Sequence, residues 1–314
     1  MDQIVIAEMM DRIGVDRLAS GGEVHYDPKL WQRPQELADR LRTAAALVVR
    51  NQTQVTSDLL ASAPQLKVIG RLGVGLDNIH VAAAKRRGIS VVTAQGANAV
   101  AVAEYVFACL LRFTRDLDAV GQSVRRGEWN RTLGGCELFG KTLGLIGLGD
   151  IGQRIALRAR CFGMTVVAYD PWQLPTRLAS TELGVRLLSA EDVYRAADFI
   201  SVHAPLTEAT RNLLDATAFA SMKPGAYVIN TARGGVVDEG ALLEAIRRGD
   251  LGGAALDVRV QEPSGEDDPL AAEPKILRTP HIAGLTEEAG VRTAAMVADD
   301  VLRVLTGESP LAPV

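Results

Sequence analysis

The chain has 314 residues, of which 47% are hydrophobic and 23% are charged, and its formal net charge is −4. This length favours two domains over one. The acidic balance argues against nucleic acid or an anionic membrane surface as the main partner. The first residues lack the basic start and long apolar core of a signal peptide, and no apolar run reaches the roughly 18 residues of a membrane helix. We therefore expect a soluble, cytoplasmic protein.

Short runs rich in Val, Ile and Leu alternate along the chain with longer helical patterns. The first series of predicted strands covers 4–7, 46–50, 67–72 and 89–94. The second series covers 142–147, 165–169, 199–203, 226–230 and 252–257. Predicted helices, among them 151–163, 238–248 and 286–306, separate or follow these strands. Such alternation predicts parallel sheets with helices on both faces.

The two strand series predict two doubly wound α/β domains rather than one very wide sheet. Between the series lie a predicted helix at 99–117 and a second helix that reaches about Gly127. The first of these is apolar around most of its circumference, so we expect it to be deeply buried or to lie at a subunit interface. The three cysteines are widely spaced and form no CxxC pair, which predicts neither a disulfide framework nor a metal site. We expect reduced, mostly buried thiols.

A glycine-rich turn joins the strand predicted at 142–147 to the helix that follows it. In GLIGLGDIGQRIA (144–156), Gly147, Gly149 and Gly152 have the GxGxxG spacing of a dinucleotide-binding turn. The first glycine permits a tight turn, the second lets the backbone approach a pyrophosphate, and the third lets the helix pack closely on the strand. Asp170 lies eighteen residues beyond Gly152, at the end of the next predicted strand. Because a carboxylate there binds ribose hydroxyls and repels a 2′-phosphate, we predict NAD as the cofactor.

Three later stretches extend this motif into a family pattern: NTARGGVVDEGAL (230–242), LDVRVQEP (256–263) and TPHIAG (279–284). With the glycine turn and GRLGVGLDNI (70–79), they resemble the D-isomer-specific 2-hydroxyacid dehydrogenases in order and spacing. The resemblance covers essentially the whole chain, most closely the 3-phosphoglycerate dehydrogenase branch in a short form without a regulatory domain. It implies a Rossmann NAD-binding domain at 99–286, inserted into a flavodoxin-like substrate domain made of 1–98 and 287–314.

The same resemblance implies that Arg233, Glu262 and His281 form the catalytic set, and their chemistry suits the interconversion of a 2-hydroxy acid and a 2-keto acid. His281 can exchange a proton near neutral pH while a hydride moves to or from the cofactor. Glu262, if it hydrogen-bonds the far ring nitrogen, would fix the tautomer and favour the imidazolium. The planar guanidinium of Arg233 can hold a carboxylate and polarise the adjacent carbonyl.

Further contacts are implied by the family's motifs. Asp257 is expected at the nicotinamide carboxamide, and the other expected cofactor contacts are Asp150, Ile151, Ala204, Pro205, Thr231, Ala232 and Gly284. Val74 and Gly75 would offer backbone N–H groups to the substrate carboxylate. Arg50, Asn51 and Arg71 lie at or just past strand ends of the first domain, where open α/β sheets bind ligands. The family also implies a homodimer paired through the helices of 99–127, and it implies no metal.

Two positions depart from the family pattern. Asp150 stands where relatives often have a basic residue, and a carboxylate beside a pyrophosphate should weaken binding unless it points to solvent. Arg259 stands where the family usually has an aromatic residue. Because a buried, unpaired charge is costly, Arg259 must reach solvent, an acidic partner within 266–268 or a ligand anion.

The sequence leaves the substrate open. Arg50, Arg71 and Arg259 are cations that could serve a second anionic group, which favours 3-phosphoglycerate or sulfolactate. VRNQT (49–53) and GRLGVGLDN (70–78) also resemble bacterial sulfolactate dehydrogenases. The alternatives are a glyoxylate or hydroxypyruvate reductase and a D-lactate-type dehydrogenase, with formate dehydrogenase less favoured. A different class, an NAD(H)-sensing co-repressor on the same fold, could keep the same motifs but is disfavoured by the lack of basic tails and linkers.

Overall fold

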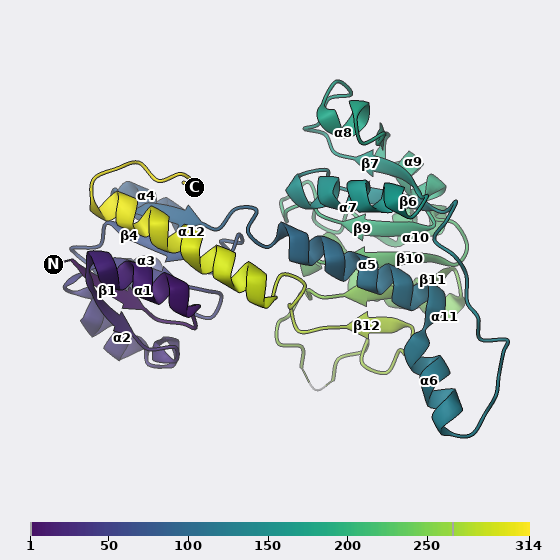
Figure 1. Cartoon of the computed structure of the whole chain (residues 1–314), viewed down its shortest axis with the longest axis horizontal. Coiled ribbons are helices and arrows are strands. Elements are labelled where there is room, and N and C mark those ends of the chain that lie inside the picture. The colour runs from purple at the N-terminus through teal and green to yellow at the C-terminus, as the bar shows by residue number, and fades with distance from the viewer. Residues whose placement is uncertain (1, 266) are drawn as a thin grey trace. The chain divides into compact units, whose positions relative to one another are not determined.

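The computed structural model describes residues 2–265 and 267–314, and the chain divides into two compact units (Figure 1). The first unit comprises 1–98 together with 285–314, and the second comprises 99–284. Each unit contains one parallel β-sheet with helices packed against it. The chain is therefore an α/β protein with two parallel-sheet domains.

The first unit contains a five-stranded, fully parallel sheet in the order β2-β1-β3-β4-β5. Its strands are β1 (Gln3–Ile6), β2 (Glu23–Tyr26), β3 (Ala44–Val49), β4 (Val68–Arg71) and β5 (Ser90–Thr93). This order is that of flavodoxin-like folds. All six residues of the central strand β3 are buried, which explains the unbroken apolar run in the sequence. The edge strand β2 has no buried residue and was not predicted.

The helices of the first unit come from both ends of the chain. They are α1 (Arg12–Gly21), α2 (Pro34–Leu41), α3 (Ser57–Ala61), α4 (Val81–Arg86) and α12 (Glu287–Leu305), with a 3-10 turn, η1, at Leu30–Gln32. In Figure 1 the yellow helix α12 lies beside α1, and it also packs on β4 and β5. Gly70 in β4 permits this approach, because a Cβ there would lie 2.6 Å from a methyl carbon of Val297.

The second unit contains a seven-stranded parallel sheet in the order β12-β11-β10-β9-β6-β7-β8. Its strands are β6 (Thr142–Ile146), β7 (Thr165–Tyr169), β8 (Arg186–Leu187), β9 (Phe199–Val202), β10 (Ala226–Asn230), β11 (Leu251–Leu256) and β12 (Ile276–Arg278). Counted from β6, this is the Rossmann order with one added strand, and the direction of winding reverses between β6 and β9. The two shortest strands, β8 and β12, were not predicted.

The helices of the second unit cover this sheet and extend beyond it. They are α5 (Ala99–Arg115), α6 (Leu117–Arg125), α7 (Asp150–Cys161), α8 (Leu178–Thr181), α9 (Ala190–Ala196), α10 (Ala216–Ser221) and α11 (Glu239–Arg248), with a 3-10 turn, η2, at Gly234–Val236. Figure 1 shows α5 beside α7, and α5 also contacts β10. The apolar helix predicted at 99–117 is thus buried for the larger part within its own unit.

Two further expectations concern burial and the membrane. Cys109 on α5 is buried, but Cys136 and Cys161 are exposed, so the expectation of mostly buried thiols was wrong. Each exposed cysteine has a charged neighbour, Glu137 beside Cys136 and Arg160 beside Cys161, which a buried position seldom accommodates. Within 2–265 and 267–314, no helix combines the length and the apolarity needed to cross a bilayer.

Candidate active site

The glycine turn of the second unit lies where β6 ends and α7 begins. Gly147 has φ +98°, and a Cβ on it would lie 2.7 Å from the carbonyl oxygen of His203. A Cβ on Gly152 would lie 2.5 Å from the carbonyl oxygen of Gly147. By contrast, a Cβ on Gly149 would meet nothing within 4 Å. Two glycines are therefore required by packing, whereas Gly149 faces open space at the start of a helix, where backbone N–H groups attract anions.

Asp170 follows β7, next to this turn. Its Oδ2 accepts a hydrogen bond from the backbone N–H of Leu148 at 2.8 Å, and its Oδ1 accepts one from the N–H of Trp172 at 2.9 Å. The carboxylate is thus held against the glycine turn at the carboxyl edge of the sheet. Asp150 is exposed and pairs with Arg154 at 3.0 Å. The carboxylate of Asp150 is thus exposed to solvent and paired with a cation, as expected for a carboxylate that does not weaken pyrophosphate binding.

The neighbouring strand ends carry the other expected cofactor contacts of the second unit. Ala204 and Pro205 follow β9, against whose end the Gly147 turn packs. Thr231 and Ala232 follow β10, and the Oγ1 atom of Thr231 is buried without a hydrogen-bond partner among the described residues. An orphaned hydroxyl, an open glycine and a carboxylate at one sheet edge fit a dinucleotide that supplies the missing partners. Ile151 is half-buried on the first turn of α7, and Gly284 is half-buried at the end of the unit.

A buried asparagine shapes the turn that carries Arg233. Asn230 is fully buried, its Oδ1 accepts from the N–H of Ala232 at 3.0 Å, and its Nδ2 donates to the carbonyl of Arg233 at 2.9 Å. Arg233 is half-buried and its Nη1 donates to the carbonyl of Ala232 at 2.7 Å. Asn230 was not foreseen as a site residue, although a polar residue that ends the apolar run AYVIN is a usable signal.

His281 and Glu262 form a direct contact. Nδ1 of His281 lies 2.8 Å from Oε2 of Glu262, and the two side chains are 43% and 38% exposed. The pair is therefore open to an incoming ligand. His281 has φ +57°, a left-handed conformation that residues with a Cβ rarely adopt. Its backbone N–H donates to the carbonyl of Asp257 at 2.9 Å, so the surrounding turn determines this conformation.

Asp257 holds the turn that follows His281. Its side chain accepts hydrogen bonds from the N–H groups of Ile282 and Ala283, both at 2.8 Å, and from Oγ1 of Thr279 at 2.6 Å. Thr279 in turn contacts the hydroxyl of Tyr105 at 2.6 Å, and burial raises the pKa of Tyr105 well above its usual value. Asp257 is 2% exposed. Its established contacts orient the His281 turn, and contact with a nicotinamide carboxamide stays a prediction.

Arg259 has acidic partners, which is one of the three environments expected for a charge at this position. Its guanidinium binds Glu239 through Nε and Nη2 at 2.9 and 3.0 Å, and Asp268 through Nη1 and Nη2 at 2.7 and 3.0 Å. The predicted partner within 266–268 is confirmed as Asp268, residue 266 lies outside the described residues, and Glu239 was not foreseen. The hydrogen bonds from Arg259 hold the pKa of Asp268 well below its usual range. Four of the five guanidinium N–H groups of Arg259 bind these two carboxylates, so the expectation that it is a spare cation for a substrate anion was wrong.

In the first unit, the expected substrate contacts lie in the turns after β3 and β4. Arg71 ends β4 and its Nη1 donates to the carbonyl of Leu72 at 3.1 Å. Val74 is exposed and Gly75 is half-buried in the following turn. The loop that begins at Arg50 is held by a carboxylate that was not foreseen. Glu8 is 3% exposed and accepts four backbone N–H bonds, from Arg50, Asn51, Gln52 and Thr53, at 2.8 to 3.2 Å.

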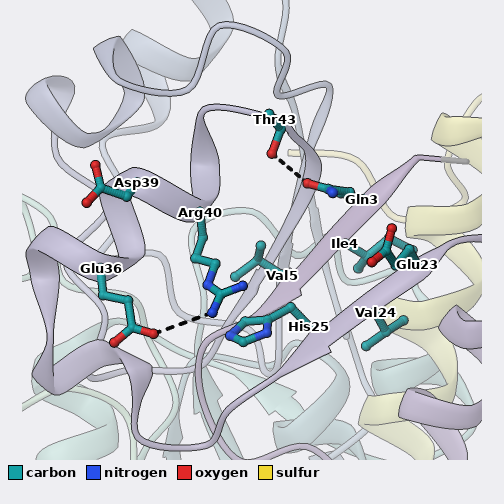
Figure 2. A pocket seen from close by; sticks show the side chains of 10 residues that line it. All are labelled: Gln3, Ile4, Val5, Glu23, Val24, His25, Glu36, Asp39, Arg40 and Thr43. Atoms are coloured by element: carbon teal, nitrogen blue, oxygen red, sulfur yellow. Dashed lines mark hydrogen bonds and ion pairs between the residues drawn. The ribbon is translucent and has the colours of Figure 1, made fainter.

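A pocket in the first unit lies away from these turns. Figure 2 shows it between β1, β2 and α2, with Gln3, Glu23 and Thr43 near the amino ends of their strands. Open α/β sheets bind ligands at the opposite, carboxyl ends. Its polar groups also contact one another, because Thr43 binds Gln3 at 2.5 Å and Arg40 pairs with Glu36 at 3.7 Å. The pocket is therefore no part of the candidate site.

Comparison with known proteins places this geometry in a family. The model of the D-isomer-specific 2-hydroxyacid dehydrogenase NAD-binding domain matches residues 107–283. The chain therefore belongs to the D-isomer-specific 2-hydroxyacid dehydrogenase family, and its second unit contains an NAD-binding domain. The match to an NAD-binding domain confirms the nicotinamide cofactor expected from the glycine turn.

Individual relatives cover the chain to different extents. The chain is 41% identical over 310 residues to the D-3-phosphoglycerate dehydrogenase of Methanocaldococcus jannaschii, a match that covers 98% of this chain but only 58% of that protein. It is 42% identical over 306 residues to the (S)-sulfolactate dehydrogenase of Chromohalobacter salexigens, covering 97% of this chain and 99% of that protein. The crystal structure of a Thermus thermophilus protein matches 99% of both chains with a TM-score of 0.90 at 36% identity.

Proposed function

We propose that the protein is an NAD-dependent dehydrogenase that interconverts a 2-hydroxy acid and its 2-keto acid. The contact between His281 Nδ1 and Glu262 Oε2 at 2.8 Å carries the proposal. An imidazole held through one nitrogen by a carboxylate presents its other nitrogen as a proton donor or acceptor. This pair lies in the unit that contains the family's NAD-binding domain.

Three residues of the chain have separate roles around the reacting carbon. The nicotinamide, when bound, supplies or accepts the hydride. Glu262 accepts a hydrogen bond from Nδ1–H of His281, so Nε2 is the nitrogen that exchanges a proton with the substrate oxygen. The carboxylate of Glu262 also stabilises the imidazolium formed when the hydroxy acid is oxidised. Arg233, three residues beyond the end of β10, holds the substrate carboxylate and polarises the carbonyl that is reduced.

The dinucleotide is held along the carboxyl edge of the second sheet. Gly149, Ile151 and the first amides of α7 receive the pyrophosphate, and Asp170 accepts the adenosine ribose hydroxyls. Each oxygen of Asp170 already accepts one backbone N–H, which leaves a lone pair on each for a hydroxyl but none of the donors that a 2′-phosphate needs. We therefore infer NAD rather than NADP as the preferred cofactor.

The substrate we infer carries a second anionic group, as in 3-phosphoglycerate or sulfolactate. Arg50 and Arg71 support this, because both lie at carboxyl ends of strands in the first unit. Val74 and Gly75 follow Arg71 and offer backbone N–H groups to a carboxylate. The near-complete mutual coverage with a sulfolactate dehydrogenase supports the same substrate class.

A panel of 2-keto acids assayed for NADH oxidation tests both the dehydrogenase activity and the second anionic group of the substrate. We expect sulfopyruvate or 3-phosphohydroxypyruvate to exceed hydroxypyruvate, glyoxylate and pyruvate in kcat/KM by about tenfold or more, because a charge-paired anion adds at least about 1.4 kcal/mol. Arg71→Gln should remove that preference, while Arg12→Gln, at an arginine whose side chain is 91% exposed on α1, should keep it. If no keto acid oxidises NADH, the dehydrogenase proposal fails. If hydroxypyruvate is preferred, only the second anionic group fails.

A homodimer paired through the helices of 99–127 completes the proposal. Leu117 and Val124 on α6 are 72% and 51% exposed, and Trp129 in the following loop is 83% exposed. Large apolar side chains gathered on one surface segment mark protein–protein contacts. Light scattering should give twice the 33.5 kDa chain mass, and Leu117→Glu should return the protein to the single-chain mass.

A further inference from the structure

The segment that carries Glu262 is attached to the rest of the second unit by a group of four charged residues. We call Arg259, Glu239, Asp268 and Arg278 the Arg259 cluster. Besides the two bidentate pairs of Arg259, Arg278 binds Asp268 at 2.9 Å. The side chains of Arg259, Glu239 and Asp268 are only 10%, 17% and 4% exposed. With two cations and two carboxylates the cluster is neutral, so none of its buried charges is left uncompensated.

The cluster binds the backbone of the segment as well as its side chain. Oε1 of Glu239, which accepts from Arg259 Nε, also accepts from the backbone N–H of Val260 at 2.9 Å. The backbone N–H of Arg259 donates to Oε1 of Glu262 at 2.8 Å, and the other oxygen of Glu262 binds His281 at 2.8 Å. An unbroken series of contacts therefore runs from the first residue of α11 to the imidazole.

The backbone of the same segment also lies directly on the turn of Arg233. A Cβ on Gly234 would lie 2.0 Å from the carbonyl carbon of Arg259 and 2.3 Å from the nitrogen of Val260. Glycine is thus required there, and a shift of the segment toward Arg233 is blocked. The bonds from Arg259 Nε and from the N–H of Val260 to Glu239 join the same backbone to α11.

The Glu262–His281 contact needs such support because it is exposed. Ion pairs open to solvent contribute little on their own, since water competes for both partners. At 38% exposure, the Glu262 side chain would adopt other orientations if its backbone moved. Bidentate arginine–carboxylate pairs are directional and therefore hold a backbone more rigidly than an apolar contact can.

We propose that Arg259 is a positioning residue for the Glu262–His281 pair, acting through Glu239 and Asp268 on the backbone that presents Glu262. The significance of this for turnover rests on the proposed dehydrogenase function, whereas the contact between Glu262 and His281 can be measured without it. On this account, ion pairs rather than an apolar contact fix the segment at the position of Arg259.

Two substitutions of Arg259 and one matched control test the proposal. Arg259→Met removes all four side-chain bonds to Glu239 and Asp268, and Arg259→Lys keeps the charge but cannot bind two carboxylates in bidentate fashion. Arg278→Met, the control, disturbs the same Asp268 but has no bond to 259–262. Circular dichroism selects the folded variants, and Arg259→Lys serves if Arg259→Met does not fold.

Two readouts separate positioning from general stability. The first is steady-state kinetics, in which we expect kcat to fall about 10- to 100-fold with KM changed less than about threefold, because misplaced acid–base groups slow chemistry without weakening binding. The second is NMR of protein labelled with ¹⁵N-histidine, with the His281 signals assigned by their loss in His281→Gln. In the unaltered protein the Nδ1 proton should be observed as hydrogen-bonded, and this signature should be lost in both Arg259 variants and kept in Arg278→Met.

The outcomes distinguish this inference from the function on which it rests. Folded Arg259 variants with unaltered kcat and an unaltered Nδ1 signal would overturn the positioning role and leave Arg259 a structural ion pair. The same would follow if Arg278→Met lost the signal to the same extent. If the unaltered protein reduces no keto acid, the proposed function fails, and the NMR comparison still decides whether Arg259 positions Glu262.

Discussion

Alanine at two glycines of the same turn should have different effects, lowering stability at Gly152 and weakening cofactor binding at Gly149. In Gly152→Ala the new Cβ would lie 2.5 Å from the carbonyl oxygen of Gly147, closer than the 3.0 Å below which real Cβ contacts essentially never fall. The start of α7 must move off β6, which we expect to lower the free energy of unfolding by roughly 1–3 kcal/mol. In Gly149→Ala the Cβ meets nothing within 4 Å, and φ of −75° suits alanine. Reduced freedom of the unfolded chain stabilises by about 0.4–1 kcal/mol and the poorer N-cap costs about as much, so stability should stay within about 0.5 kcal/mol.

The assay pairs urea unfolding with a fluorescence titration of NADH. Gly149→Ala should unfold like the unaltered protein yet bind NADH at least about tenfold more weakly, equivalent to about 1.4 kcal/mol, because its methyl group occupies the space of the pyrophosphate. Gly152→Ala should unfold at a lower urea concentration than the unaltered protein. A Gly149→Ala protein with unaltered NADH affinity would refute the inference that open space at Gly149 receives the cofactor.

Three further predictions concern the site and its surroundings. Glu262→Gln should lower kcat about tenfold or more with little change in KM, because the neutral amide no longer stabilises the imidazolium; steady-state rates check this, and an unaltered kcat would contradict it. Burial lowers the pKa of His203 from 6.5 to about 3, so the unfolded chain binds a proton that the native chain does not. The contribution of neutral His203 to the free energy of unfolding is therefore fully present above pH 6.5 and is lost toward pH 3, by up to about 1.4 kcal/mol per pH unit. His203→Gln should reduce this dependence of the free energy of unfolding, measured with urea, on pH. Burial raises the pKa of Cys109 to about 11, so a thiol reagent at pH 8 should label the two exposed cysteines quickly and Cys109 only after unfolding; equally fast labelling of all three would contradict this.

The sheets were predictable where strands are buried on both faces. Strands such as β3 and β9 are entirely buried and give unbroken apolar runs, which identify them in the sequence. The strands that were not predicted are an edge strand, β2, and the two- and three-residue strands β8 and β12. Short strands of this kind are formed by pairing with a neighbour that is already in place, which leaves no periodic signal in their own residues.

The site was predictable where a motif is local and less so where it depends on contacts across the fold. The turn with Gly147, Gly149 and Gly152 is readable from spacing, since each glycine has a separate geometric role within six residues. Glu262 and His281 are brought together as the family resemblance implied, while their catalytic roles stay predictions. The link between Arg259 and Glu239 joins the loop after β11 to the start of α11, twenty positions apart, and no local pattern indicates it.

Polar residues that end buried strands provided a signal that was not used. Glu8 follows β1 and Asn230 ends β10, and both are almost fully buried while bonding several backbone groups of a neighbouring turn. A buried polar side chain must have its partners supplied by the fold, so such a residue at a carboxyl strand end marks a turn held in one conformation.

The central claim is that His281, held by Glu262, exchanges the proton during turnover. The most direct measurement compares the unaltered protein with His281→Gln for kcat with the preferred 2-keto acid and for NADH affinity. We expect kcat to fall by about 100-fold or more while the dissociation constant for NADH changes less than about threefold. A His281→Gln protein that turns over at the unaltered rate, with NADH still bound, would contradict the claim.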